Sequence, residues 1–207
     1  MLADQDDISI ETDLYCKEIL GEEYSITTDE SVTYQKDGTA INITYTTPDD
    51  SDYSVEAVAA GRTAVEDGLY SVDDNVITLS GDLKPGSYTV TFSDDKYASK
   101  KSSTLVESGL EEGSVSIENN AVVISDNEQG LTGADYAAQV TSVVVNGEPV
   151  KAKGIAGILF NEDGSINMDA EIEGQDGNVK VFDGSDSYEI ELEATGYPFV
   201  KGTVTAQ

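Results

Sequence analysis

Two segments of the chain alternate strictly between apolar and polar residues, and the second repeats the pattern of the first 100 residues later. Alternate residues of an extended chain share one face. The apolar face carries Tyr88, Val90 and Phe92 in the first segment and Tyr188, Ile190 and Leu192 in the second. A turn precedes each segment, and a tyrosine, Tyr97 or Tyr197, follows it five residues on. This repetition predicts the same strand of a β-sandwich twice, in two similar domains.

The sequence around these segments is also typical of β domains. From residue 25 onward, short alternating runs recur at spacings of roughly 8–12 residues and are separated by turn sequences such as Asp-Gly, Pro-Gly and Asn-Gly. A stretch rich in glutamate and glycine at 107–113 interrupts the pattern before it starts again. We therefore expect an all-β fold of two tandem Ig-like antiparallel β-sandwich domains, at 25–107 and 108–207, after an acidic lead-in segment at 1–24.

Turn residues between apolar runs predict several β-hairpins. The predicted hairpins pair residues 31–34 with 40–45, 69–72 with 76–79, 114–117 with 121–125, and 157–160 with 166–168, and another is closed by Asn146-Gly147. A short helical turn is expected within 134–140. Residues 14–20 fit either a short helix or an extended strand.

The charge of the chain limits its partners. It has 41 acidic and 11 basic residues, a net charge of −30, and no histidine. Such a charge excludes a general affinity for nucleic acid or an anionic membrane surface, and it favours neutral, cationic or divalent partners. The apolar runs fall short of the roughly 20 residues of a membrane span, so we expect no membrane insertion.

Cys16 is the single cysteine, so an internal disulfide is excluded. Lipid attachment at Cys16 would require an apolar run before it, but no such run is present and Tyr15 is bulky, so a buried or partly buried thiol is the favoured interpretation. An acidic β-rich composition with little cysteine is typical of secreted or wall-attached bacterial proteins. We therefore expect an extracellular or cell-wall location, with the signal segment outside this chain.

Residues 83–90 resemble the turn and strand of fibronectin type III and related Ig-like domains, in which a tyrosine at the strand start bonds back to the preceding corner. Three stretches of the second half, 122–124, 140–147 and 187–197, are similar to the hemoblock or hemin-interacting type of Ig-like repeat in Gram-positive surface proteins. This resemblance implies an Ig-like module exposed on the cell surface, able in some relatives to bind haem. The first half has Lys96 where the second has Gly196, and it resembles a generic Ig-like module.

Haem binding, which the resemblance implies for some relatives, requires an axial donor and an apolar slot. Met168, beside a predicted hairpin turn, is the candidate axial ligand, and Tyr197 is the second candidate cofactor-binding residue. Met1 and Cys16 are further donors. Core packing is the competing interpretation for Met168 and for Tyr197, which follows the bend at Gly196. The residues alone therefore predict no cofactor, with haem as the alternative.

Metal binding has only a weak pattern in this sequence. Residues 161–167 imitate the middle of a calcium loop, but the outer ligand positions fall on Leu159 and Ala170, so a hairpin turn explains them better and no metal site is predicted. Loose acidic clusters at 49–52 and 94–95 are expected to face solvent. A lysine–asparagine isopeptide bond has candidate residues, but no spacing selects a pair.

We expect a non-catalytic, exported bacterial cell-surface module that serves as a spacer or as an adhesion or binding element of a larger protein. No catalytic residue is predicted, because a serine or cysteine nucleophile would lack a histidine base and the many carboxylates select no pair. The partners would be an unknown surface ligand or other domains of the parent protein. The alternatives are a haem-binding module, through the second domain, and a carbohydrate-binding module, which would use tyrosines such as Tyr45, Tyr53 and Tyr70.

Overall fold

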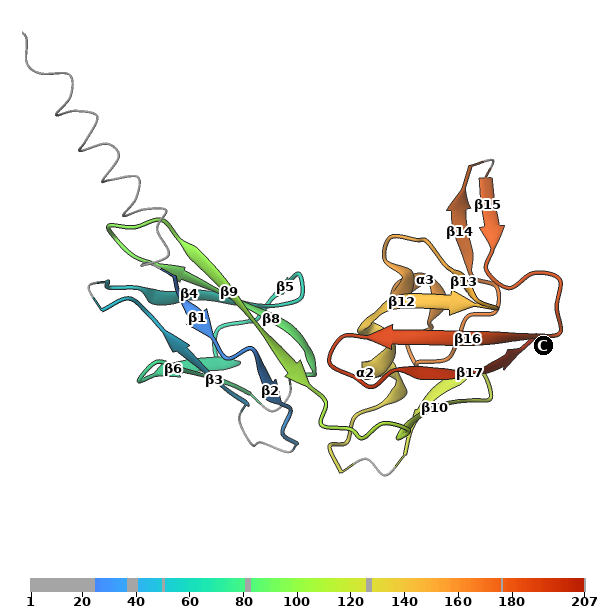
Figure 1. The fold of residues 1–207 in the computed structure, drawn as a ribbon, viewed down its shortest axis with the longest axis horizontal. Coiled ribbons are helices and arrows are strands. Elements are labelled where there is room, and N and C mark those ends of the chain that lie inside the picture. The colour runs from blue at the N-terminus through green and yellow to red at the C-terminus, as the bar shows by residue number, and fades with distance from the viewer. Residues whose placement is uncertain are drawn as a thin grey trace, which may run out of the picture. The chain divides into compact units, whose positions relative to one another are not determined.

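The computed structural model describes residues 25–36, 41–49, 51–80, 83–125, 128–175 and 177–206, and most of its elements are antiparallel strands (Figure 1). The predicted lead-in segment at 1–24, with Met1 and Cys16, lies outside the described residues. Within the described residues, unit 1 comprises 25–32, 42–80 and 88–104, and unit 2 comprises 33–41, 83–87 and 105–206. The predicted all-β fold of Ig-like antiparallel sheets is confirmed, and the domain boundary at 107–108 stays a prediction.

Two sheets account for the strands of the first half. One has the strand order β1-β3-β7-β6 and the other β2-β9-β8-β4-β5. The bounds are β1 Thr27–Thr28, β2 Ser31–Thr33, β3 Ile41–Thr46, β4 Ser54–Ala60, β5 Thr63–Ala64, β6 Tyr70–Asp73, β7 Val76–Leu79, β8 Gly86–Ser93 and β9 Lys100–Glu107. Tyr45 on β3 and Phe92 on β8 belong to different sheets, and their ring centroids lie 5.1 Å apart. The two sheets therefore share a core, as in a sandwich.

Strand β8 confirms the alternation predicted for residues 87–92. Its apolar residues Tyr88, Val90 and Phe92 are each at most 2% exposed, while the residues between them are exposed or half-buried. The β6–β7 hairpin is confirmed as well. Asp74 and Asn75 at its tip have φ angles of 44° and 63°, as a type I′ turn requires.

The hairpin predicted between residues 31–34 and 40–45 is wrong. Strand β2 lies beside β9 in one sheet, and Tyr34 continues this pairing by donating its N–H to the carbonyl of Glu107 at 2.7 Å. Strand β3 lies in the other sheet, between β1 and β7. A turn sequence reports only that the chain reverses locally, so it cannot distinguish a return to the same sheet from a crossing to the opposite one.

The second half contains a four-stranded sheet of order β13-β12-β16-β17, two two-stranded sheets, β10-β11 and β14-β15, and two short helices. The bounds are β10 Val115–Glu118, β11 Ala121–Ile124, α2 Gly133–Ala138, β12 Val140–Val145, β13 Glu148–Pro149, α3 Ile155–Leu159, β14 Glu171–Gly174, β15 Gly177–Lys180, β16 Ser187–Ala194 and β17 Val200–Thr205. Side chains from the four-stranded sheet, from β10 and β11 and from both helices form one hydrophobic core. Among the described residues, no helix has the length and apolar character that crossing a membrane requires.

Strand β16 repeats the pattern of β8. Each lies between two neighbours in its sheet, β12 and β17 for β16 and β9 and β4 for β8. The β4–β8 and β12–β16 ladders each contain a register shift near one end. Tyr188, at the start of β16, is buried and its hydroxyl accepts a hydrogen bond from the N–H of Ser185 at 3.1 Å. The Ig-like resemblance implies a bond of this kind for Tyr88, which occupies the corresponding position on β8.

The predicted helical turn and two of the predicted hairpins in the second half are confirmed. α2 begins with a capping box between Thr132 and Asp135, and β10–β11 and β12–β13 pair as expected. The hairpin predicted between 157–160 and 166–168 is wrong, because the chain is helical through Leu159 and only a bridge between Phe160 and Ile166 remains. A short apolar run has no periodicity that separates a strand from one turn of helix.

Candidate functional site

Met168 lies at the edge of a hollow of about 500 Å³. The hollow is lined by Asn119, Asn120, Asn161, Ser165, Ile166, Asn167, Met168, Asp169, Lys180, Phe182 and Ala206. Met168 itself is half-buried and packs against the core, and Lys180 and Asp169 form an ion pair at 3.4 Å. Most of the lining groups are amides, hydroxyls or charges, so the hollow is better suited to a polar group than to the apolar face of haem.

Residues 161–167, which imitate the middle of a calcium loop, form a turn. This was predicted because the outer ligand positions fall on Leu159 and Ala170, whose side chains have no oxygen. Asn161 accepts the N–H of Gly164 on its carbonyl at 3.0 Å, which closes the turn. The Asp163 carboxylate accepts bonds from the hydroxyl and the N–H of Ser165, and these bonds lower the pKa of Asp163. Among the described residues, no group of three or more acidic or cysteine side chains is placed to hold a metal ion.

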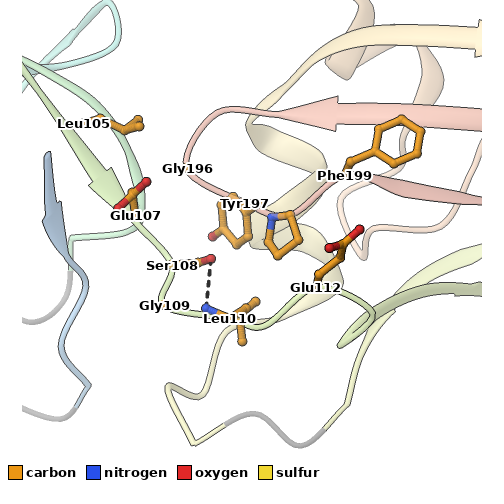
Figure 2. A pocket seen from close by; sticks show the side chains of 10 residues that line it. Leu105, Glu107, Ser108, Gly109, Leu110, Glu112, Gly196, Tyr197 and Phe199 are labelled. Carbon is orange, nitrogen blue, oxygen red and sulfur yellow. Dashed lines mark hydrogen bonds between the residues drawn. The ribbon is translucent and has the colours of Figure 1, made fainter.

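Tyr197 lies at a second hollow, of about 510 Å³, in unit 2 (Figure 2). This hollow is lined by Leu105, Glu107, Ser108, Gly109, Leu110, Glu112, Gly196, Tyr197, Pro198 and Phe199. Gly196 has a φ of +80° and accepts a hydrogen bond from the N–H of Ser108 at 2.7 Å. The glycine of this bend thus brings two distant parts of the chain together, because it tolerates a left-handed conformation.

The ring of Tyr197 packs inward. Its centroid lies 5.4 Å from that of Tyr136, at an edge-to-face angle of 65°. Tyr136 is fully buried on α2 and donates its hydroxyl to the carbonyl of Leu192 at 3.1 Å. This contact agrees with the interpretation of Tyr197 as a packing residue. Met168 and Tyr197 line different hollows, so the two candidate residues do not form one site.

Phe199 is the residue at this hollow that sequence reasoning missed. Its side chain is 51% exposed, one of three large exposed apolar side chains among the described residues. The neighbouring Val200 begins β17 and is buried. Because adjacent residues of an extended chain face opposite sides, the apolar pair Phe199-Val200 was a usable signal that one of the two side chains points outward.

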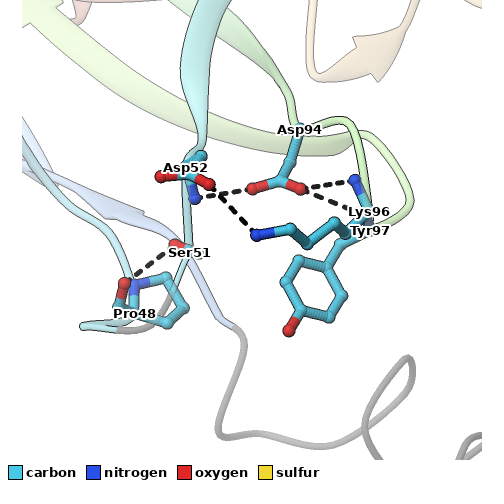
Figure 3. Close-up of polar contacts among 6 residues, drawn as sticks. All are labelled: Pro48, Ser51, Asp52, Asp94, Lys96 and Tyr97. Atoms are coloured by element: carbon cyan, nitrogen blue, oxygen red, sulfur yellow. Dashed lines mark hydrogen bonds and ion pairs between the residues drawn. The ribbon is translucent and has the colours of Figure 1, made fainter.

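Asp49, Asp52 and Asp95 of the acidic clusters are exposed, as expected, and the fold brings Asp52 close to the half-buried Asp94 (Figure 3). The Asp94 carboxylate accepts the N–H groups of Asp52 and Lys96, each at 2.7 Å, and of Tyr97 at 3.2 Å. The Lys96 ammonium pairs with the Asp52 carboxylate at 3.2 Å. The N–H of Lys96 and the other donors hold the pKa of Asp94 below its ordinary value of 3.8. The cluster therefore ties the start of β4 to the turn after β8.

We expect Asp94→Asn to lower the melting temperature of the chain at pH 7, because the charge and one of the two acceptor oxygens are lost. Since the pKa of Asp94 is lowered in the folded state, its stabilising effect is present above pH 3.8 and is lost as the pH falls toward the lowered value. Thermal unfolding at neutral pH and at acid pH measures this effect. The difference in melting temperature between Asp94→Asn and the wild type should be smaller at acid pH than at pH 7. Asp95→Asn, at an exposed neighbouring residue, is the matched control. An equal difference in melting temperature at both pH values would contradict a stabilising role of the ionised Asp94 carboxylate.

Two of the three tyrosines expected to form a carbohydrate platform are buried. Tyr45 and Tyr53 are each 7% exposed. Tyr53 stacks on Tyr97 at a centroid distance of 6.2 Å, and its hydroxyl donates to the carbonyl of Ala98 at 2.9 Å. Only Tyr70 is partly accessible. The three residues therefore do not offer a joint stacking surface for a sugar.

Comparison with known families identifies the part of the chain that contains Met168 and Tyr197. Residues 111–206 match the family model "Heme-binding protein Shr-like, Hb-interacting domain". The match covers just under half of the chain and includes Met168, Tyr197 and Phe199. It confirms the resemblance of the second half to hemin-interacting repeats. We call residues 111–206 the Shr-like segment.

Other comparisons are distant. No curated protein sequence matches the chain. Solved structures with a similar arrangement include murine CEACAM1b, at 9% identity, covering 88% of this chain and 99% of that one with a TM-score of 0.28. The fibronectin(III)-like modules of CbhA from Clostridium thermocellum match at 11% identity, 87% and 92% coverage and a TM-score of 0.28. A SusE-like surface-located polysaccharide-binding protein from Bacteroides thetaiotaomicron matches at 13% identity and a TM-score of 0.28, with 88% of this chain covering 25% of that one.

Proposed function

We propose that the chain is a non-catalytic binding module of an exported bacterial surface protein, and that its Shr-like segment binds haemoglobin through protein contacts. The observation that carries this proposal is the match of residues 111–206 to a domain described as Hb-interacting. The surface location follows from the resemblance of the same segment to repeats of Gram-positive surface proteins. We therefore favour a binding element over a plain spacer as the role of this chain.

Contact with the protein part of haemoglobin fits this segment better than ligation of free haem. The chain has no histidine, which is the axial ligand of many haem proteins. The hollow beside Met168 is lined mainly by polar groups, and the ring of Tyr197 packs on Tyr136. These features support recognition of a protein surface: the hollow at Met168 is too polar for the porphyrin, and the Tyr197 ring is engaged in packing.

Immobilised haemoglobin is expected to capture the purified full-length chain with a dissociation constant on the order of micromolar or tighter, the range open to a standard interface. Biolayer interferometry measures this constant, with immobilised serum albumin as the control surface. Saturable binding to haemoglobin and none to albumin would support the proposal. Equal responses on the two surfaces, or no response on either, would overturn it.

Ligation of haem by Met168 is the second candidate function. It is favoured by the position of Met168 at a hollow of about 500 Å³ within a segment whose family description includes haem binding. Titration of the chain with haemin, followed in the Soret band, separates the two candidates. The preferred proposal predicts no shift and unchanged haemoglobin capture by Met168→Leu. A Soret shift that Met168→Leu abolishes would support the second candidate instead.

A further inference from the structure

We infer that haemoglobin docks on the face formed by Tyr197, Pro198 and Phe199 of the Shr-like segment and the adjacent Leu110, with Glu112 at its rim. The partner surface it fits is an apolar recess bordered by lysine or arginine. This inference rests on the proposed function and adds to it the residues that make the contact and the chemistry that they recognise.

Phe199 is held in place for such a contact although its ring is exposed. The next residue, Val200, is buried and pairs with Leu192 in the β16–β17 ladder. The preceding residue is Pro198, whose ring restricts its own backbone. A side chain with few torsions on a fixed backbone loses little conformational entropy on binding, so the exposed ring is suited to be an anchor.

The surroundings of Phe199 are concave and partly apolar. Leu110, Tyr197 and Pro198 line the same hollow, and each is half-buried. Leu110 and Tyr197 also pack against the core of the second half, which fixes the floor of the hollow. Aromatic anchors beside well-packed pockets carry most of the binding energy in many protein interfaces. The arrangement therefore offers both a projecting ring and a recess for a partner side chain.

Charge selects the kind of partner. Glu107 and Glu112 line the hollow and are exposed (Figure 2). The whole chain carries a net charge of −30, so an approaching surface with lysine or arginine around an apolar centre is favoured and an acidic one is repelled. Exposed charges are screened by salt, so binding should weaken as ionic strength rises.

Val179 provides a matched comparison within the same segment. It is 53% exposed, nearly the same as Phe199. It lies on β15, whose four residues are all exposed, and it is absent from the hollow around Tyr197. Replacing either side chain by serine removes a similarly exposed apolar group, so the two variants differ chiefly in whether they alter the proposed docking surface.

The test compares the wild type, Phe199→Ser, Val179→Ser and Glu112→Lys as full-length chains on immobilised haemoglobin. We expect Phe199→Ser to bind at least about tenfold more weakly, as truncation of an anchor does, and Val179→Ser to bind like the wild type. Glu112→Lys should weaken binding and reduce its salt dependence. Unchanged melting temperatures establish that each variant is folded.

The outcomes separate this inference from the proposed function. If the wild type binds and Phe199→Ser binds equally well, the docking surface is wrong while the proposed function stands. Equal weakening by Phe199→Ser and Val179→Ser would likewise overturn the docking surface. If the wild type does not bind haemoglobin, the proposed function fails and this inference fails with it.

Discussion

Replacing Gly133 by alanine is expected to destabilise the second half of the protein by about 3 kcal/mol, the upper range for overpacking a tightly packed site. Gly133 is the first residue of α2. A Cβ atom at this position would lie 2.0 Å from the carbonyl oxygen of Val122 on β11 and 3.0 Å from its carbonyl carbon. Both are backbone atoms, so no side-chain rotation can relieve the clash.

The backbone around Gly133 has little room to move. A Cβ atom on Gly164 would itself lie 2.6 Å from the backbone nitrogen of Ala134 and from the carbonyl carbon of Gly133. Gly164 also accepts a hydrogen bond from the N–H of Val122 at 3.4 Å. The start of α2, strand β11 and the turn at Gly164 therefore meet closely through backbone atoms, and displacing one segment disturbs the other two.

Chemical denaturation followed by far-ultraviolet circular dichroism measures this prediction, with Gly157→Ala as the matched control. Gly157 is also in a short helix, α3, but a Cβ atom there would meet nothing within 4 Å. Alanine at this position should leave the stability unchanged or raise it by up to about 1 kcal/mol, because glycine is the poorer helix former. If both variants shift the unfolding midpoint alike, the close approach of Gly133 to the Val122 backbone does not restrict this position to glycine.

Truncation of Tyr136 to alanine is expected to cost about 4 kcal/mol, as for other large aromatic side chains removed from a core. The side chain is fully buried, its ring contacts that of Tyr197, and its hydroxyl donates to the carbonyl of Leu192 on β16. It thus connects α2 to β16, one of the two inner strands of the four-stranded sheet. The milder Tyr136→Phe keeps the ring and removes only the hydrogen bond, for which we expect about 1 kcal/mol.

The pH dependence of unfolding provides a second measurement on Tyr136. Burial raises the pKa of its hydroxyl above the ordinary value of 10.0. The group therefore stabilises the folded state fully below pH 10.0, and this contribution is lost as the pH rises toward the raised pKa. The wild type should lose stability in alkali faster than Tyr136→Phe does. Parallel curves for the two proteins above pH 10.0 would show that this hydroxyl does not carry the effect.

Several elements were predictable from the sequence because local physics decides them. The strict alternation at 87–92 and 187–192 identified the buried faces of β8 and β16, since a strand places alternate side chains on opposite sides. Asn146-Gly147 identified the β12–β13 hairpin because both residues accept the positive φ that its turn requires. The resemblance to hemin-interacting repeats, confirmed for residues 111–206, likewise depended on runs of neighbouring residues.

The candidate site was predictable only in part. Tyr197 was a candidate cofactor-binding residue with core packing as the competing interpretation, and its ring lies against that of Tyr136. Met168 was identified as a ligand candidate, but the polarity of its hollow depends in part on Asn119 and Asn120, which are distant in the chain. The apolar pair Phe199-Val200 indicated that one of the two side chains points outward, but which one is exposed depends on contacts between residues 108–112 and 196–199, which are far apart in the chain.

By itself the sequence determined that this protein is built of antiparallel strands, which of their faces are buried and where several of its tight turns fall. Those features follow from the chirality and periodicity of the extended chain. Only the tertiary structure decided that β2 and β3 belong to different sheets, that Gly133, Gly164 and Val122 meet through their backbones, and that Phe199 projects beside a hollow. Each of these depends on contacts between segments far apart in the chain, whose free energies no local pattern encodes.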